Sequence, residues 1–509
     1  MRKSEDFRGY GLYRKALTMQ FYTAVFLNCL IWLWPLMHGP LPAFWPDFVA
    51  VVASILLLAV IPNKSNEFLK TISVGWLTAA LLSALIGIAQ YMGLGDTFSP
   101  FVVNAIPGTA IGNTRQTNHL ATFIGVGLVS LFWLRGRYNL NRAVPFAAAL
   151  LVTALATTSS RTGALQLVFL MALLFFWSKD TRRRALLTIG FVLAIYFAAS
   201  ALLPWILKAF AGSKGLDVIQ RFSDTSLQCS SRRVLWSNVL DLVAVKPWWG
   251  WGWGELNYAH YETLLEGLRY CEKLGHAHNI FLEVAVDSGL PIAIGVLVLF
   301  AYLLAQLRPW RESNPDRQWL WAIFGLLFIH SMLEYPLWFG NFQSLLVLAV
   351  LAFVKTGNSG TLVSGLTLSH RAKTHQRIAT LLIFLGFAGY VGWDYFKVSQ
   401  LYTPTAQRPE MFRSDTFAKV GGSFIFGSQV IFAQVVTTDL TRDNAASMLD
   451  AATLSLHLSA EPRVIEKVIE SAVMLGQDDI AKWHMLRYQR AYPEDYKRWQ
   501  IVKPVDAMR

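Results

Sequence analysis

The sequence predicts an all-α membrane protein: a polytopic bundle of about eleven transmembrane helices with a long outer loop and a small helical C-terminal domain. Of its 509 residues, 54% are hydrophobic and only 15% are charged, and the mean hydropathy is +0.39. The apolar residues fall in blocks of spanning length, and most of the excess positive charge lies in short loops between the blocks. These observations exclude an ordinary soluble globular protein and a soluble chain with a single secretory signal.

Eleven apolar blocks have lengths that suit helices crossing a hydrocarbon core of about 30 Å. In lipid, a spanning segment must satisfy its backbone hydrogen bonds internally, which favours helices. The blocks lie near residues 16–38, 45–62, 71–94, 119–134, 143–158, 162–178, 185–207, 279–306, 318–335, 338–354 and 377–395.

The cations predict the orientation, because loops rich in Lys and Arg stay on the cytoplasmic side of a membrane. The amino-terminal tail and alternate loops after it carry these cations: Arg2, Lys3, Arg8, Arg14, Lys15, Lys64, Lys70, Arg135, Arg137, Arg142, Lys179, Arg182 to Arg184, Arg308, Arg311, Arg317, Lys355, Arg371, Lys373 and Arg377. We therefore expect a cytoplasmic N-terminus. The net charge of +13 is explained by membrane orientation, so no nucleic-acid partner is expected.

An odd number of spans places the polar tail on the opposite, outer side. We therefore predict two domains, a transmembrane domain over 1–395 that includes the outer loop 208–278, and an outer C-terminal domain over 396–509. Helical periodicity within the tail predicts two or three antiparallel helices over 444–457, 462–474 and 478–492. Residues 472–481 look like part of a tetratricopeptide repeat, which predicts at most a docking module.

Two of the three cysteines, Cys229 and Cys271, share the long outer loop. In an oxidising outer compartment they can form a disulfide that ties the loop down. Two free thiols are the alternative, because the sequence does not give the distance between the two Cα atoms.

The short outer loops are nearly uncharged except for dense polar clusters, and the long outer loop adds further clusters. These clusters contain Arg115, Gln116, Asn118 and His119; Ser160 and Arg161; Arg232 and Arg233; the aromatic run 247–254; His276, His278 and Asn279; and His330, Glu334 and Tyr335. Topology and cluster position come from separate features of the sequence, yet every cluster falls at one membrane face.

Arginines at the outer interface break the charge rule, which points to an anionic ligand at headgroup level. Guanidinium groups match phosphate oxygens two at a time, so a diphosphate can be held by Arg115, Arg161 and Arg232 together.

Each cluster also has a purely structural alternative. Arg161 can anchor its helix to lipid headgroups, and Arg232 with Arg233 can be a solvated loop pair. The residues from Arg115 to His119 can cap a helix, and the aromatic run can form a membrane-interface belt.

His278 has the side chain whose ordinary pKa suits general-base work near neutral pH, although a histidine at a helix start is more often a cap. A catalytic metal is not expected, because His276-x-His278 is short and the outer loops show no obvious set of third and fourth ligands, such as a Cys pair or a carboxylate-x-carboxylate pattern. No cofactor is predicted.

These clusters resemble motifs of the O-antigen ligase and polymerase superfamily. The similar segments are Ser160-Arg161-Thr-Gly163, Arg232-x-x-x-Trp236, Lys246-Pro-Trp-Trp-Gly-Trp-Gly252, His278-Asn279-Ile-Phe-Leu282 and Asp287-Ser-Gly289. The segments 112–121 and 330–338, with the tail after 396, further resemble bacterial O-linked protein oligosaccharyltransferases of the PglL type.

The resemblance implies a metal-independent glycosyltransferase in the bacterial inner membrane, with its C-terminal domain in the periplasm. Its donor would be a glycan on undecaprenyl pyrophosphate, and its acceptor a Ser or Thr of a periplasmic protein such as pilin. The family's essential histidine falls on His278, and its arginines fall on Arg161 and Arg232. Its glutamine and tyrosine fall on Gln116 and Tyr335. Arg115 departs from the family pattern, which leaves its role open.

For substrate binding, we expect contributions from Arg115, Gln116, Asn118, His119, Arg233, Asn279, Glu334 and Tyr335. Three alternatives differ in function. An O-antigen ligase would transfer the glycan to lipid A core, and a polysaccharide polymerase would extend the glycan. A lipid-linked sugar transporter would need charged residues at mid-bilayer depth, where the predicted spans have few.

Overall fold

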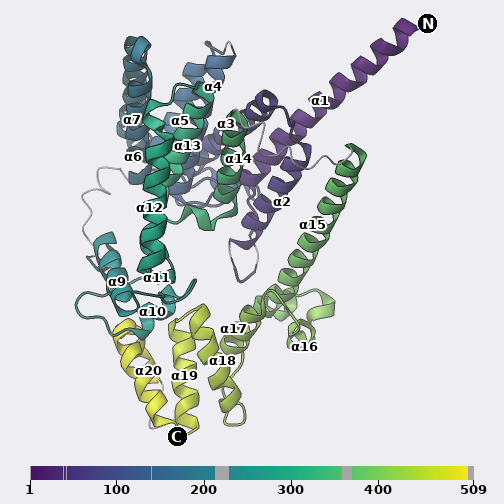
Figure 1. The fold of residues 1–509 in the computed structure, drawn as a ribbon. Helices are drawn as coiled ribbons and strands as arrows, with labels where there is room; N and C mark the ends of the chain where they lie inside the picture. Colours follow the sequence, from purple (N-terminus) through teal and green to yellow (C-terminus); the bar gives the residue numbers. More distant parts are fainter. Residues whose placement is uncertain are drawn as a thin grey trace. The chain divides into compact units, whose positions relative to one another are not determined.

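The computed structural model describes residues 2–37, 39–41, 43–138, 140–211, 228–357 and 370–502. Every regular element in these ranges is a helix (Figure 1), which confirms the all-α class. The chain forms two compact units. The first comprises Met1–Met37, Pro42–Asp224 and Leu304–Gly386, and the second comprises His38–Leu41, Thr225–Leu303 and Phe387–Arg509.

The first unit is built from long apolar helices. They are α1 (Arg2–Leu33), α2 (Phe44–Val60), α3 (Ser65–Tyr91), α4 (Thr117–Arg137), α5 (Val144–Thr157), α6 (Arg161–Trp177), α7 (Arg182–Ala211), α13 (Pro315–Ser331) and α14 (Gly340–Thr356), with the short 3-10 helices η1 (Gly95–Phe98), η2 (Lys179–Thr181), η4 (Pro309–Arg311) and η5 (Pro336–Trp338). Helix α3 packs against α1, α4 and α5, and α4 packs in addition against α6 and α13.

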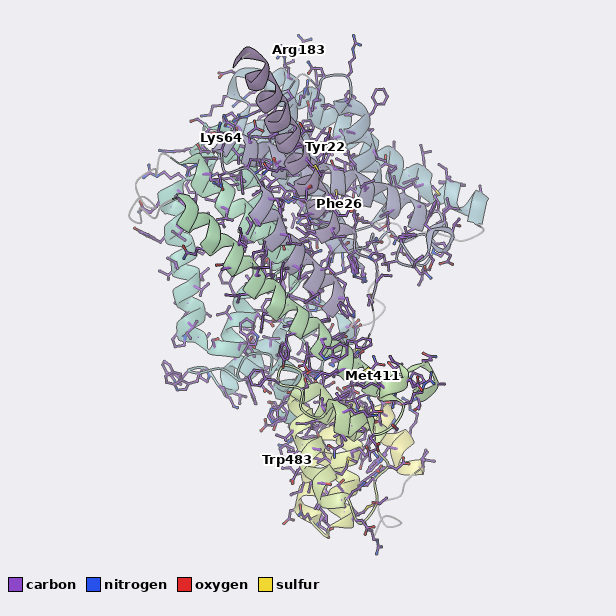
Figure 2. The ribbon with its side chains drawn as sticks, turned by 90° about the vertical axis from the view of Figure 1, so that its right-hand side faces the viewer. Tyr22, Phe26, Lys64, Arg183, Met411 and Trp483 are labelled. Atoms are coloured by element: carbon purple, nitrogen blue, oxygen red, sulfur yellow. A yellow bond between two sulfur atoms is a disulfide. The ribbon has the colours of Figure 1, made fainter. Side chains whose placement is uncertain are left out.

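Helix α1 shows how these helices divide between core and lipid. Ala24 and Ile31 are buried in the apolar core of the unit, whereas Tyr22 and Phe26 are 67% and 63% exposed and point outward (Figure 2). Exposed aromatic and aliphatic side chains over a buried apolar core are what a helix bundle presents to hydrocarbon, not to water. The protein is therefore a multi-pass membrane protein.

Among the described residues, five helices are long and apolar enough to cross a membrane: Ser65–Tyr91, Thr117–Arg137, Lys179–Ala209, Leu290–Arg311 and Ile378–Tyr402. Five shorter apolar helices accompany them: Thr18–Leu33, Phe44–Val60, Val144–Thr157, Arg161–Trp177 and Gly340–Thr356. Each of the eleven predicted blocks overlaps at least one helix, and the count of eleven spans stays a prediction.

The second unit holds the outer-loop helices, the C-terminal helices and parts of two long helices that lead into it. They are α9 (Arg232–Val245), α10 (Leu256–Glu262), α11 (Ile280–Ser288), α12 (Leu290–Leu307), α15 (His370–Ser399), α16 (Thr416–Val420), α17 (Gly427–Thr437), α18 (Ala445–Leu458), α19 (Pro462–Met474), α20 (Asp478–Ala491) and α21 (Pro493–Val502), with η3 (Gln228–Ser230), η6 (Gln400–Tyr402), η7 (Thr405–Gln407) and η8 (Glu410–Phe412). Helices α18 to α20 confirm the three helices predicted in the tail, and the prediction missed α16, α17 and α21.

The predicted span over 279–306 is wrong in one respect, because it is two helices and not one. Helix α11 ends at Ser288, α12 begins at Leu290, and Gly289 between them has a φ of 89°. A Cβ at Gly289 would lie 2.3 Å from the carbonyl oxygen of Trp248, so only glycine fits. Hydropathy did not reveal the break because both flanking segments are apolar.

The aromatic run 247–254 docks on this break through its backbone. The Trp251 and Gly252 N–H groups donate to the carbonyls of Val286 and Asp287 at 2.8 and 3.0 Å. The rings of Trp248, Trp249 and Trp253 remain 71%, 88% and 76% exposed. The run therefore presents an aromatic surface on a fixed backbone, compatible with either a sugar-binding platform or an interface belt.

In the structure, a disulfide joins Cys229 to Cys271, and the two Cα atoms are 5.4 Å apart. It closes a segment that packs around its own apolar core, which includes Leu235, Val239 and Tyr270. The same segment reaches the C-terminal helices, since the amide N–H of Ala460 donates to Asn257 Oδ1 at 2.8 Å. For this reason the outer loop groups with the tail, whereas the predicted domain boundary at 396 separates them.

We expect the second unit to become less stable as the pH falls from about 6.5 towards 4. His484 is buried, and its ring lies 2.8 Å from the hydroxyl of Tyr261. Burial lowers the pKa of His484 to about 4 from its ordinary 6.5. The unfolded chain therefore binds this proton more readily than the folded chain, so stability is complete above pH 6.5 and declines below it.

Urea unfolding of the full chain between pH 4.5 and 7.5 measures this slope, and His484→Gln, which does not titrate, should flatten it. Equal slopes in the two proteins would contradict the prediction.

Candidate functional site

Asn118, at the start of α4, is the centre of a hydrogen-bonded cluster in the first unit. Its Nδ2 donates to Glu334 Oε1 at 3.1 Å, and its Oδ1 accepts from Ser160 Oγ at 2.6 Å. Gln116 Nε2 lies 3.5 Å from Glu334 Oε2. Three segments that the sequence analysis selected separately are thus joined. We call Gln116, Asn118, Ser160 and Glu334 the amide cluster.

Local sequence explains why Ser160 faces Asn118. Ser160 is the N-cap of α6, where its Oγ accepts from the Gly163 N–H at 2.9 Å. The turn before it contains Ser159 in the left-handed region, with a φ of 48°. Gly163 lets α6 approach α4 closely, because a Cβ there would lie 2.7 Å from the Cβ of Ala121.

Arg161 immediately follows this cap, as the first residue of α6, and its side chain is exposed. A helix N-terminus carries a partial positive charge and unpaired N–H groups, so Arg161 adds a full charge where anions are already favoured. The amide cluster fixes the helix end from which Arg161 projects.

Glu334 and Tyr335 belong to the turn between α13 and α14. Glu334 is 6% exposed, and Tyr335 is half-buried with its ring stacked on that of Phe339 at 5.7 Å. The ring of His119 meets Phe339 edge-on at 4.5 Å, and His119 is 2% exposed. His119 is therefore a packed core residue beneath the cluster.

A second polar network lies one turn further into the bundle, and of its members the sequence analysis singled out only His330. Thr122 Oγ1 lies 3.1 Å from Gln166 Oε1 and 2.9 Å from His330 Nδ1. Gln166 Nε2 donates to the carbonyl of Leu326 at 2.8 Å. The available signal was a polar residue inside each of three apolar blocks, which in a membrane marks a bundle interior.

Arg115 occupies a different place from Arg161. It has a φ of 64°, and its Nη2 donates to the carbonyl of Pro35 at 2.8 Å. A cavity of about 180 Å³ lies beside it, lined also by Asp47 and His119. Burial lowers the pKa of Arg115 to about 10, and the charge of Asp47 acts in the opposite direction. Arg115 ties the loop to the end of α1.

The second unit contains Arg232, Arg233, His278 and Asn279. Arg232 begins α9, whose N-cap Ser231 accepts from the Val234 N–H at 3.4 Å, and Arg233 is exposed. One turn later, Trp236 Nε1 donates to the carbonyl of Ala277 at 3.1 Å. Trp236 of the Arg-x-x-x-Trp segment therefore anchors α9, which begins with Arg232, to Ala277, the residue that precedes His278.

His278 stands in an unusual backbone conformation between two fixed residues. Its φ is 52°, in the left-handed region, and its side chain is half-buried. After it, Asn279 caps α11 by accepting from the N–H groups of Phe281 and Leu282 at 3.1 and 3.3 Å. Before it, Glu283 accepts from Ala277 N and lies 2.8 Å from His276 Nδ1. The imidazole is presented from a strained, well-anchored turn.

The predicted site residues thus form two groups. Gln116, Asn118 and Glu334 are brought into direct contact in the first unit, with Arg115, His119, Arg161 and Tyr335 on the same or neighbouring segments. Arg232, Arg233, His278 and Asn279 are gathered in the second unit by the Trp236–Ala277 hydrogen bond.

The amide cluster gives a stability prediction. Asn118→Leu keeps the size of the side chain but removes both the bond to Ser160 and a bond to the buried Glu334 carboxylate. We expect it to destabilise the protein by about 1–3 kcal/mol, since a buried polar group that loses a hydrogen bond keeps its desolvation cost.

Thermal unfolding in detergent measures the effect of Asn118→Leu. Asn63→Leu, at an exposed loop position of the same unit, is the control and should change little. Equal melting temperatures for the two variants would refute the role given to the cluster.

Three known families match different parts of the chain. The family described as "O-Antigen ligase" matches residues 146–297, and "Protein glycosylation ligase" matches residues 110–134, which hold Arg115 to His119. "Virulence factor membrane-bound polymerase, C-terminal" matches residues 318–505.

Two curated proteins of Acinetobacter baylyi are similar. The "ComP-specific O-oligosaccharyltransferase" is 26% identical over 351 residues, 67% of this chain and 61% of that protein. The "General O-oligosaccharyltransferase" is 27% identical over 279 residues, 52% of this chain and 46% of that protein. The matches thus span about half to three fifths of the length of these relatives. With the three family matches, they support the resemblance of this chain to PglL-type proteins of the O-antigen ligase superfamily.

Proposed function

We propose that this protein is an O-oligosaccharyltransferase. It transfers a preassembled glycan from undecaprenyl pyrophosphate to a Ser or Thr hydroxyl of a periplasmic acceptor protein such as pilin. The cation pattern supports an inner-membrane protein with a cytoplasmic N-terminus and a periplasmic C-terminal domain. The names of the two relatives support a lipid-linked donor and a protein acceptor.

The observation that carries the proposal is the amide cluster. It joins the segment of Gln116 and Asn118, the cap that precedes Arg161 and the turn of Glu334 by side-chain hydrogen bonds. A purely structural set of caps does not need three polar segments to converge from separate outer loops. Convergence beside an exposed arginine at a helix N-terminus is what a phosphate-binding site requires.

The chemistry assigns a role to each group. The acceptor oxygen attacks C1 of the first sugar, the bond from C1 to the pyrophosphate oxygen breaks, and undecaprenyl pyrophosphate leaves with the electron pair. Arg161 and Arg232 stabilise the negative charge that grows on this leaving group. His278 takes the proton of the hydroxyl, because a neutral hydroxyl is a poor nucleophile.

The remaining residues position these three. Gln116, Asn118 and Glu334 hold the loop that faces the donor, Tyr335 shapes the acceptor side, and Asn279 fixes the turn of His278. Arg233 adds charge near Arg232. Arg115 supports the loop through Pro35 rather than through direct contact with the donor.

The direct test is transfer by the purified full chain in detergent. Lipid-linked glycan is incubated with a pilin-type protein or with lipid A core, and the products are analysed by mass spectrometry. Glycopeptides modified at Ser or Thr are expected only with the protein acceptor. Transfer to lipid A core alone would identify an O-antigen ligase.

Two rival functions are transfer of the glycan to lipid A core and extension of the glycan. They are supported by the family matches described as O-antigen ligase and as membrane-bound polymerase. All three reactions share the donor and the leaving group, so the acceptor distinguishes them. Lengthening of the lipid-linked glycan without any acceptor would identify a polymerase.

A further inference from the structure

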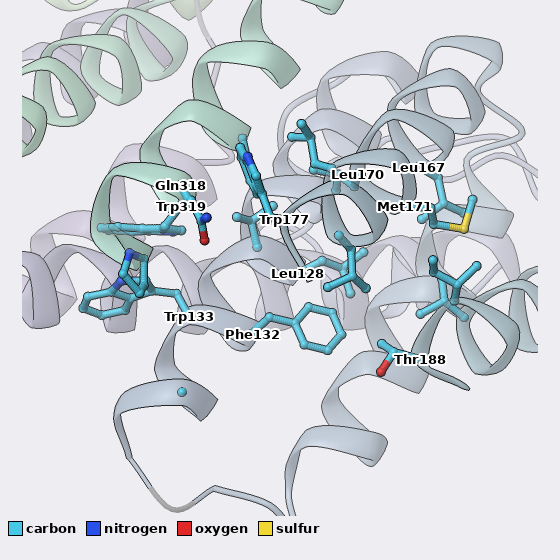
Figure 3. A pocket seen from close by; sticks show the side chains of 18 of the residues that line it. Leu128, Phe132, Trp133, Leu167, Leu170, Met171, Trp177, Thr188, Gln318 and Trp319 are labelled. Atoms are coloured by element: carbon cyan, nitrogen blue, oxygen red, sulfur yellow. The ribbon is translucent and has the colours of Figure 1, made fainter. Parts of the chain in front are cut away.

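A second cavity lies in the first unit, away from the amide cluster. It has a volume of about 380 Å³ and opens between α4, α6, α7 and α13 (Figure 3). Its walls are almost entirely apolar and include Leu128, Phe132, Leu170, Trp177, Val192 and Trp319. A cavity with such walls in a membrane-spanning bundle is a place for hydrocarbon.

This cavity is separate from the proposed active site. Its lining residues on α4 run from Leu128 to Arg137, which are 10 and 19 residues beyond Asn118. At a rise of about 1.5 Å per residue, they lie about 15 to 28 Å further along the helix. The cavity is therefore near the opposite end of α4, where the cations predict the cytoplasmic leaflet.

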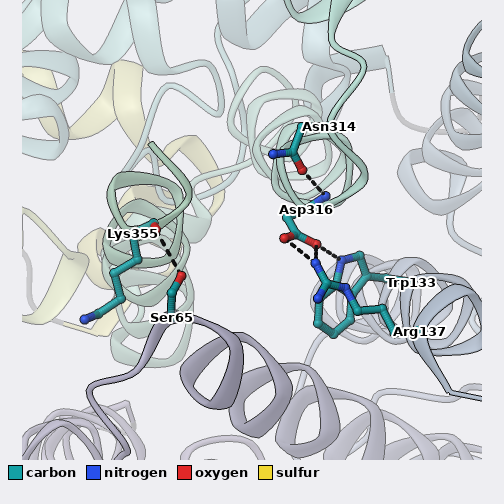
Figure 4. A network of polar contacts seen from close by, with 6 residues as sticks. All are labelled: Ser65, Trp133, Arg137, Asn314, Asp316 and Lys355. Carbon is teal, nitrogen blue, oxygen red and sulfur yellow. Dashed lines mark hydrogen bonds and ion pairs between the residues drawn. The ribbon is translucent and has the colours of Figure 1, made fainter. Parts of the chain in front are cut away.

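Two of the lining residues, Trp133 and Arg137, contact the carboxylate of Asp316. Arg137 Nη2 donates to both carboxylate oxygens of Asp316, and Trp133 Nε1 donates to Asp316 Oδ1 at 2.9 Å (Figure 4). Asn314, the N-cap of α13, accepts from the Asp316 N–H at 2.9 Å. The charge of the Asp316 carboxylate is thus compensated by Arg137, so it does not repel an anion near this part of the cavity.

A dense group of cations lies next to the α7 wall. Residues 179–184 contain Lys179, Arg182, Arg183 and Arg184, all exposed, with Asp180 as the one acidic residue in that segment. Figure 2 shows Arg183 pointing away from the bundle. Thr188, one turn after Arg184, already lines the cavity. We call residues 179–184 the basic segment.

We propose that this cavity binds one anionic phospholipid, with an acyl chain between α4, α6, α7 and α13 and the phosphate against the basic segment. The charge decides the class of lipid, because basic pockets between transmembrane helices attract anionic headgroups of the cytoplasmic leaflet. The apolar walls supply most of the affinity, and the cations select the headgroup. The site is independent of the proposed transfer reaction.

Native mass spectrometry of the full chain tests the proposal with phosphatidylglycerol and phosphatidylcholine of identical acyl chains. Phosphatidylglycerol should bind as a single retained lipid, about tenfold or more tightly than phosphatidylcholine. Equal affinity for the two lipids would overturn the proposal. So would binding of undecaprenyl phosphate in place of phosphatidylglycerol, since the cavity would then serve the carrier tail.

Gly136→Phe provides the matched variant. Gly136 lines the cavity, and a Cβ there meets no atom within 4 Å, so a side chain can be added at the edge of the cavity without a clash at its Cβ. We expect about tenfold weaker phosphatidylglycerol binding, because the ring excludes at least two methylenes of the chain. Gly190→Phe on α7, which is equally open but does not line the cavity, should bind phosphatidylglycerol as the wild type does.

Wild-type affinity for phosphatidylglycerol in Gly136→Phe would refute the placement of the lipid in this cavity. The comparison of the two lipids on the wild type decides the headgroup even if this variant fails to fold.

Discussion

His278→Asn is expected to lower the rate of glycan transfer by about 10² to 10⁴-fold while the protein remains folded. Asparagine is the informative replacement, because His278 has a φ of 52° and Asn adopts the left-handed region more readily than Ala does. An alanine variant would mix the loss of the base with backbone strain. The asparagine side chain keeps the turn but does not accept a proton at neutral pH.

His278→Gly supplies the control for a structural role. Glycine also tolerates the left-handed turn, and it leaves room where the imidazole stood. If the ring acts as a base, added imidazole should restore part of the activity of His278→Gly. It should leave the rate of the wild type unchanged. Failure of rescue, together with full activity in His278→Asn, would reduce His278 to a residue that shapes the turn.

Helix positions were predictable because lipid imposes a simple rule on composition. Blocks such as 71–94 and 119–134 overlap α3 and α4, since an uncharged apolar segment of that length has no stable alternative in hydrocarbon. The break at Gly289 was not predictable from hydropathy, because it arises from a contact with the backbone of Trp248, which is distant in sequence.

The same limit explains the site. The residues Asn118, Ser160 and Glu334 stood out as polar groups at loop ends, but the sequence does not say which loops meet. Their contact depends on the close packing of α6 against α4 at Gly163. The deeper network was missed although His330 stood out, because Thr122 and Gln166 are single uncharged residues that barely change the hydropathy of an apolar block.

Arg161→Gln is expected to lower the transfer rate by about 10² to 10³-fold, because the leaving pyrophosphate loses a fixed positive charge. Arg161 is exposed, so this variant should melt at the wild-type temperature. Arg142→Gln, an exposed arginine on the predicted cytoplasmic side, is the matched control and should transfer glycan at the normal rate. A normal transfer rate in Arg161→Gln would contradict this role. Arg161 would then only anchor its helix to lipid headgroups.

Combining Arg161→Gln with Arg232→Gln tests whether the two units serve one ligand. Arg161 belongs to the first unit and Arg232 to the second. If both hold the same pyrophosphate, the double variant should lose less than the product of the two single losses, because groups that act together are not additive. Steady-state rates for the four proteins give the coupling. Losses that multiply would mean that the two arginines bind different groups, and the assignment of a shared diphosphate site would be wrong.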